Sequence, residues 1–260
     1  MTDAQENIQG ESNDESRSPL TPSAPKLIDT PLQDESGYID GILRNREWYF
    51  EEIFSGPGIW RHISKLLVIL ILLTALHGVI MGASASWMQM VSSGLKLPLL
   101  YLLSTLICFP VLYVINVIMG SKLSCPRTLA LILLSLSLNG ILLASCAPIV
   151  LFFALTGATY DFLKVLEVAI LFFCGVCAMG GLWKGLEAMC EKSSLYPKQA
   201  VRILFVWGIV FGIVGTQMAW SLRPFVGTPN MEFEWFRTFD YSNFYESVFH
   251  SLGEMMGTLD

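Results

Sequence analysis

The chain has 260 residues, of which 53% are hydrophobic and only 15% are charged. That composition excludes an ordinary soluble globular domain, which needs a more polar surface. The formal net charge of −6 comes from residues 1–40, which hold nine acidic residues against Arg17 and Lys26. No basic region of the kind that binds nucleic acid is present, and the six cysteines fall mostly inside apolar runs, unlike a secreted disulfide framework.

Residues 1–40 are rich in Ser, Pro, Asp, Glu and Gln. Such a segment buries too little apolar surface to offset the entropy of ordering it, so we predict a disordered acidic tail on the cytoplasmic side. A docking or phosphorylated tail is the alternative, for which SPLTPSAP offers sites. We expect no signal peptide, because the first apolar run begins beyond residue 60 and follows an acidic region.

Residues 41–60 alternate aromatic or aliphatic side chains with charged ones. Apolar residues three and four apart, with Trp48 and Tyr49 among them, predict an amphipathic helix at the membrane surface that ends near 56–58. A helix that binds a soluble partner is the alternative.

Five apolar runs follow, each about as long as a helix must be to cross a hydrocarbon core of about 30 Å. The fold class predicted is therefore all-α, a polytopic membrane protein with five transmembrane helices and amphipathic flanking helices. The predicted spans, which together form one bundle over 61–222, are 63–83, 97–120, 128–155, 163–186 and 201–222.

The second and third spans form the central hairpin, from Lys96 to Leu155. A seven-residue basic turn at 121–127 joins them. Each span contains an internal proline, Pro110 or Pro148, which predicts a kink.

Lysine and arginine near the span ends predict the orientation, because cytoplasmic loops are enriched in them. One side collects Arg61, Lys65, Lys122, Arg127, Lys184, Lys192, Lys198 and Arg202. The other side has Lys96, Lys164, Arg223 and Arg237. We therefore expect a cytoplasmic N-terminus and an outside C-terminus.

Residues 223–260 form an aromatic outer tail in this topology. Asn243 and Glu246 have the spacing of a helix cap, followed by an apolar face at Phe244, Val248 and Leu252. At about 14 residues this short amphipathic helix cannot span, and we expect it on the outer surface or over the mouth of the bundle.

Ionisable residues inside a membrane would be the first functional clue, because they are costly in lipid. His77 in the first span either binds a ligand or protons, or hydrogen-bonds to a neighbouring helix. The second interpretation is favoured, since no Asp or Glu is expected at mid-membrane to relay a proton. Asp161, Lys164 and Glu167 share one helical face, and an interfacial cap and ion pair explains them.

Three amides within the spans either bridge helices or line a polar path, and bridging is favoured. These are Asn116, Asn139 and Gln217. Pairs of glycines four apart predict close helix packing within the chain or, alternatively, homodimerisation. The pairs are Gly208 with Gly212, and Gly181 with Gly185.

Cys174 and Cys177 are three apart on one helix face, at a depth similar to Cys108 and Cys146. Four thiols at one depth predict a soft-metal or disulfide-exchange site, but no nearby cation favours thiolates, and cysteine is also a small packing residue. No hydrolase, protease or phosphate-loop motif is present. We therefore predict no catalytic, cofactor-binding or metal-binding residues.

The hairpin resembles a known family. Lys96-Leu-Pro98, the turn Gly120-Ser-Lys-Leu-Ser and a span that ends in Ala147-Pro148 resemble the Yip-type, or Rab-interacting, membrane proteins over about residues 60–222. More closely, the whole chain resembles uncharacterised bacterial inner-membrane proteins, some of which carry an actin-binding label. The resemblance implies five spans, a cytoplasmic N-terminus and action by recruitment rather than catalysis.

The function expected is that of a non-enzymatic membrane protein, a scaffold or membrane-organising component that acts through lipid, membrane-protein or homo-oligomeric contacts. The bacterial inner membrane is its expected location. A small transporter or transporter subunit is the alternative, motivated by the two prolines and by Asn139 at mid-depth. A membrane thiol oxidoreductase using Cys174 and Cys177 is a third hypothesis.

Overall fold

The computed structural model describes residues 58–118, 120, 123–192, 198–226 and 244–255, with five single residues, Ile39, Ile42, Phe50, Ile53 and Trp235. This part of the chain is helical and contains no strand. The helices are α3 (Ile59–Gly82), α4 (Trp87–Ile118), α5 (Cys125–Leu155), α6 (Tyr160–Lys192), α7 (Lys198–Leu222) and α8 (Phe244–Met255).

Five of these helices, α3 to α7, are long and apolar enough to cross a membrane. Their spanning stretches have mean hydropathies from 1.5 to 2.3, and each overlaps one of the five predicted spans. The prediction of an all-α membrane protein with five spans is confirmed. The chain is an integral membrane protein.

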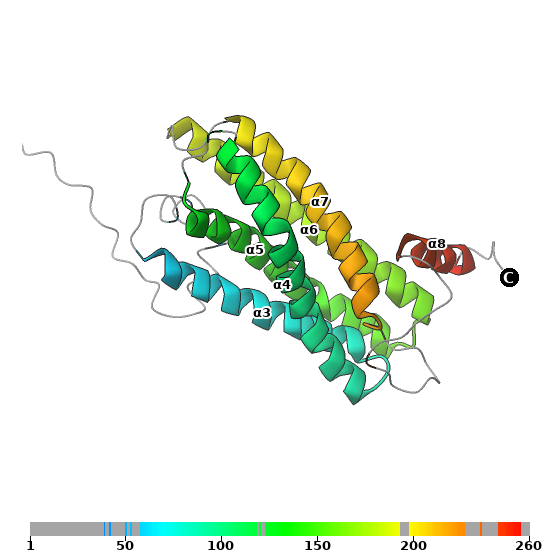
Figure 1. Cartoon of the computed structure of the whole chain (residues 1–260). Coiled ribbons are helices and arrows are strands. Elements are labelled where there is room, and N and C mark those ends of the chain that lie inside the picture. The colour runs from blue at the N-terminus through cyan, green and yellow to red at the C-terminus, as the bar shows by residue number, and fades with distance from the viewer. Residues whose placement is uncertain are drawn as a thin grey trace, which may run out of the picture.

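The five long helices run alongside one another in one bundle (Figure 1), and their contacts close into a ring. Going round it, α3 packs against α4, α4 against α7, α7 against α6, α6 against α5, and α5 against α3. The short helix α8 lies outside this ring, against α6 and the end of α7. This short helix lies beside the end of the bundle where α6 begins, since its Ser247 contacts Lys164.

Helix α3 begins directly after Gly58, whose positive φ of 83° is a left-handed conformation that favours glycine. The outward face of α3 carries Val68, Leu72 and Leu76, four residues apart and between 46% and 56% exposed. Such a face suits contact with lipid, where apolar side chains need no protein partner.

Helix α4 begins ten residues before the predicted second span. The sequence placed Lys96 at the membrane boundary, yet α4 starts at Trp87 and Lys96 is only 3% exposed. Averaged hydropathy missed this first part because it contains Gln89, Ser92 and Ser93, which are also buried. These polar side chains are buried because they pack against other parts of the chain.

Glycines set the crossing of α3 and α4. A Cβ atom added to Gly78 would lie 2.4 Å from the backbone oxygen of Ser93, and one added to Gly82 would lie 2.6 Å from the backbone of Gln89. The backbones therefore approach too closely for any side chain, as in small-xxx-small helix pairs. The Gly78–Gly82 spacing was visible in the sequence but was not singled out.

Side-chain hydrogen bonds tie the ring together between helices. Ser137 of α5 donates to the Leu66 carbonyl of α3 at 2.9 Å, and the indole of Trp207 on α7 donates to the Cys108 carbonyl of α4 at 3.1 Å. Because these side chains donate hydrogen bonds to backbone carbonyls of neighbouring helices, their polar groups do not face hydrocarbon.

The predicted tail and surface helix lie mostly outside the described residues. Within 41–60, Ile42, Phe50 and Ile53 are helical and at most 2% exposed. Ile42 and Phe50 line a small cavity with Leu134 of α5 and Leu182 of α6. These side chains thus belong to the protein core rather than to a face turned towards lipid.

Candidate functional site

A pocket with polar and apolar walls lies at the α8 end of the ring. It encloses about 790 Å³, its open mouth included. Its walls come from α3, α4, α6, α7, α8 and the segment 223–226 that follows α7. Its wall side chains include polar or charged and apolar residues, among them Leu97, Leu100, Tyr160, Lys164, Glu167, Leu171, Trp220, Arg223 and Phe244.

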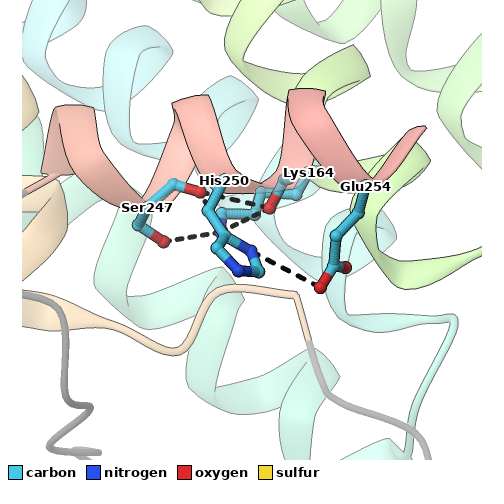
Figure 2. A network of polar contacts seen from close by, with 5 residues as sticks. Lys164, Ser247, His250 and Glu254 are labelled. Atoms are coloured by element: carbon cyan, nitrogen blue, oxygen red, sulfur yellow. Dashed lines mark hydrogen bonds and ion pairs between the residues drawn. The ribbon is translucent and has the colours of Figure 1, made fainter. Parts of the chain in front are cut away.

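Lys164 connects the pocket to α8. Its ammonium group donates to the carbonyl of Ser247 at 3.0 Å, to the hydroxyl of Ser247 at 2.6 Å and to the hydroxyl of Ser251 at 2.8 Å. Figure 2 shows Lys164 reaching α8 beside Ser247, while His250 and Glu254 form a separate ion pair of 3.5 Å. All three hydrogen-bond partners of the ammonium are neutral, while the carboxylates of Asp161 and Glu254 act on its charge through space.

Arg223 supplies a second positive charge to the same pocket. Its guanidinium carbon lies 3.4 Å from the centre of the Trp220 ring, a close cation–π contact. Burial lowers the pKa of Arg223, and the nearby Tyr160 opposes that shift. Arginine still remains protonated at neutral pH. The pocket therefore has two cationic wall residues.

The segment after α7 is fastened to the polar start of α4. The amide of Gln89 donates to the carbonyls of Pro224 and Phe225, both at 3.0 Å, and the hydroxyl of Ser93 donates to Phe225. Lys96 donates to the carbonyls of Pro224, at 3.3 Å, and Trp235. Sequence reasoning missed this cluster, although Gln89, Ser93 and Lys96 fall on one helical face.

His77 and Glu167 form a buried pair at the inner wall of the pocket. The ring atom Nε2 of His77 lies 3.1 Å from Oε2 of Glu167, and Nδ1 lies 2.9 Å from the carbonyl oxygen of Leu143. Their side chains are 0% and 4% exposed. The contact with Leu143 agrees with the favoured bond to a neighbouring helix. The argument that His77 has no Asp or Glu to relay a proton did not anticipate Glu167, which contacts it from α6.

Of the cap and ion pair predicted at the start of the fourth span, Asp161 lies in the first turn of α6 and its charge acts on Lys164. Lys164 and Glu167 do share one face of α6, since both line the pocket. However, Glu167 contacts His77 and Lys164 contacts the serines of α8. Sequence spacing identified the face but not the partners, because these come from α3 and α8.

The three amides have different surroundings. Asn139 donates to the hydroxyl of Tyr101 on α4 at 3.0 Å, which is a bridge between helices. Asn116 is 2% exposed. Gln217 lies on the exposed side of α7 and does not line the pocket. Pro110 and Pro148 lie inside α4 and α5 on exposed faces.

The structure pairs Cys174 with Cys146 rather than with Cys177. The two sulfur atoms of Cys174 and Cys146 are 4.0 Å apart, and Cys177 is exposed. Among the described residues, no group of three or more His, Cys, Asp or Glu side chains could hold a metal ion.

The two candidate glycines of α7 differ. A Cβ atom on Gly208 would lie 2.3 Å from the end of Met179 on α6, whereas one on Gly212 would meet nothing within 4 Å. Gly208 is thus a packing position between α6 and α7. Gly212 has open space beside it.

Comparison with protein-family models, with curated proteins and with solved structures finds no match for this chain. The pocket and the buried pair are therefore interpreted from their own geometry.

Proposed function

We propose that this chain is a non-enzymatic membrane-organising protein that binds an anionic phospholipid in the pocket at the α8 end of the bundle. The observation that carries the proposal is one pocket whose walls hold two cations, Lys164 and Arg223, together with several apolar side chains and the buried Glu167. An anionic amphiphile has the matching chemistry, with a charged headgroup and an apolar chain.

The charged part of the pocket faces the end of the bundle. Lys164 lies one turn inside the start of α6, and Arg223 directly follows the end of α7. Positions at the ends of spanning helices lie at the depth of lipid headgroups. Because the hydrogen-bond acceptors around Lys164 are neutral, a phosphate there could form a charge-assisted hydrogen bond with its ammonium group.

The apolar part of the pocket lies deeper. Leu171 is seven residues beyond Lys164 on α6, which places it about 10 Å further along the helix axis. Leu97 and Leu100 of α4 line the same space. This change from charged to apolar walls supports an amphiphile over a small soluble anion, which would leave the apolar walls without a partner.

Lipid binding by purified protein tests the proposal. In detergent micelles the protein should retain phosphatidylglycerol over phosphatidylcholine, as measured by native mass spectrometry. Replacing both cations, Lys164→Met with Arg223→Gln, should weaken that preference about 30-fold, because each cation near anionic lipid contributes about 1 kcal/mol.

Arg61→Gln with Lys65→Met is the matched control. These two cations are exposed on α3, about 30 Å along that helix from the pocket residue Met81. The control should keep the preference of the wild type. Equal loss in both double variants, or no preference in the wild type, would contradict a phospholipid site in the pocket.

The remaining parts of the proposal concern location and partners. We also propose that the chain lies in the bacterial inner membrane with its N-terminus in the cytoplasm. Its relationship to the Yip-type proteins and its contacts with a membrane protein or a second copy are proposals as well. The five helices that are long and apolar enough to span support membrane insertion alone. Tagging the two termini and measuring their accessibility in intact cells would test the orientation.

A small transporter is the second candidate function. The buried His77–Glu167 pair favours it, because ionisable groups within spans mark proton or ion paths. Flux measurements in proteoliposomes would distinguish it from an organising role. The oxidoreductase hypothesis now involves Cys146 with Cys174, since these sulfurs are the close pair.

A further inference from the structure

Three helices meet at the side chain of His77. The residue is on α3, its Nδ1 atom contacts the Leu143 carbonyl on α5, and its Nε2 atom contacts Glu167 on α6. His77 is fully buried and Glu167 is 3% exposed. Water therefore does not mediate either contact, and the hydrogen atoms in them must come from the two side chains.

The positions of those hydrogen atoms follow from the chemistry of the partners. A carbonyl oxygen only accepts, so Nδ1 of His77 carries a hydrogen and donates it to Leu143. At 3.1 Å, Nε2 and Oε2 are within hydrogen-bond distance, which requires a second hydrogen between them. Either Nε2 donates it to a carboxylate, or a protonated Glu167 donates it to Nε2.

Both arrangements contain the same number of protons. Each has one proton more than a neutral imidazole beside a carboxylate, and each gives the pair a net charge of zero. Without that proton, a lone pair on Nε2 would face an anionic oxygen in a buried place, where unpaired charge is costly. The geometry thus belongs to the protonated pair.

The second oxygen of Glu167 connects the pair to the pocket. Oε1 is buried and has no hydrogen-bond partner in the described part of the chain, and Glu167 is a wall residue of the pocket. The other titratable wall residues are Tyr160, Lys164 and Arg223. Helix α4 contributes apolar Leu97 and Leu100 there, and its Lys96 is bound to the Pro224 carbonyl.

Among the described residues, the hydrogen-bond partners of His77 on the side away from the pocket include no further acid or base. The partner that α5 supplies is the Leu143 carbonyl, and the thiol of Cys146 on that helix lies against Cys174. The pocket is therefore the side from which a proton can reach Glu167.

We propose that His77 and Glu167 form a buried proton-binding site that exchanges one proton with the pocket through Glu167. On release, the proton leaves the Nε2–Oε2 hydrogen bond for a water molecule or a basic group in the pocket. From either starting arrangement the product is a neutral ring with its hydrogen on Nδ1 beside a Glu167 carboxylate, and the net charge of the pair changes from zero to minus one. Uptake reverses each of these changes.

This inference goes beyond phospholipid binding and does not depend on it. The two are linked by charge alone. The protonated pair leaves Lys164 and Arg223 as the charges of the pocket, whereas the deprotonated pair adds a negative charge beside them. Any anion that binds there should favour the protonated pair, and by linkage proton uptake should favour the anion.

The test uses the full chain in lipid nanodiscs with ¹⁵N-labelled histidine. The chain has three histidines, so His62→Gln with His250→Gln leaves His77 as the sole labelled ring. At neutral pH, NMR should find a hydrogen on Nδ1 of His77. The second proton should be found either on Nε2, by NMR, or on the Glu167 carboxyl, by infrared spectroscopy. Raising the pH should remove one proton per chain from the pair.

Glu167→Gln in the same background is the decisive variant. Its amide donates to Nε2 without any shared proton, so the ring should be neutral, with its hydrogen on Nδ1, and should not change as the pH rises. The exposed pair of His250 and Glu254, 38% and 45% exposed, serves as the control, because its protons exchange directly with solvent in the wild type.

Two results would overturn the proposal. One is a neutral His77 ring beside an ionised Glu167 at neutral pH. The other is a pair that keeps its proton unchanged over the whole pH range in which the protein stays folded, which would show a fixed hydrogen bond without exchange. Both are read from the wild-type pair, so a variant that fails to fold does not affect them.

Discussion

The two ends of the five-helix bundle carry their positive charges in different ways. At the end where α3 begins, Arg61, Lys65 and Lys184 are exposed and Arg127 is half-buried. At the end where α8 lies, the cations turn inward. They are Lys96, which is 3% exposed, and the partly buried Lys164 and Arg223.

The two ends differ in the energetic role of their cations as well as in the number of cations. An exposed ammonium is solvated by water and headgroups, so it affects topology more than stability. A buried one needs hydrogen-bond acceptors in the protein. Lys96 has backbone carbonyls and Lys164 has the serines of α8 as acceptors. We therefore expect substitutions of cations at the α8 end to lower the free energy of unfolding, and substitutions at the other end to change it little.

The largest effect should follow from His77→Leu, which leaves Glu167 buried without its partner. Breaking a buried charged pair from one side costs about 3 to 5 kcal/mol. The free energy of unfolding, measured in mixed micelles, should fall by that amount.

Replacing both members, His77→Leu with Glu167→Leu, should recover most of that loss, because apolar residues often substitute well for a whole buried pair. The exposed pair provides the comparison, and His250→Leu should change stability little. A His77→Leu protein as stable as the wild type would mean that the pair contributes nothing to the fold.

A smaller effect is expected for Lys96→Met, which removes the donor to the Pro224 and Trp235 carbonyls. Hydrogen bonds from a charged group contribute about 2 kcal/mol, and the unfolding free energy should fall by about that much. Lys65→Met makes the same change on an exposed face of α3. Similar losses in the two variants would contradict the difference between the ends.

The five spans could be predicted because hydrocarbon thickness imposes a length that a single run of residues must satisfy. The start of α4 could not be predicted in this way. Gln89, Ser93 and Lys96 lower the local hydropathy, and they are buried only because the carbonyls of Pro224 and Phe225 lie beside them. Those partners are more than 120 residues away in the sequence.

The candidate site shows the same limit. The sequence indicates His77 as an ionisable residue within a span. It also indicates that Lys164 and Glu167 are neighbours on one helical face. Their partners come from helices far along the chain, with 90 residues between His77 and Glu167 and 83 between Lys164 and Ser247. Periodicity identifies which side chains share a face, whereas the order of helices round the ring decides which faces meet.

The smallest effect concerns the attachment of α8. Ser247→Ala with Ser251→Ala removes both hydroxyls that accept from Lys164 and leaves the Ser247 carbonyl. Two lost hydrogen bonds should weaken the docking of α8 by about 1 to 2 kcal/mol. Amide hydrogens of α8 should then exchange about 5 to 30 times faster, while those of α3 stay unchanged.

Glu254→Gln is the control for that experiment, because it changes the same helix at an exposed pair with His250. Such a pair contributes little, so exchange in α8 should remain close to the wild type. Equal acceleration in both variants would mean that α8 responds to any change of its polar face. Acceleration in the serine variant alone would show that the inward-turned Lys164 holds α8 over the pocket, a role that none of the exposed cations at the opposite end can have.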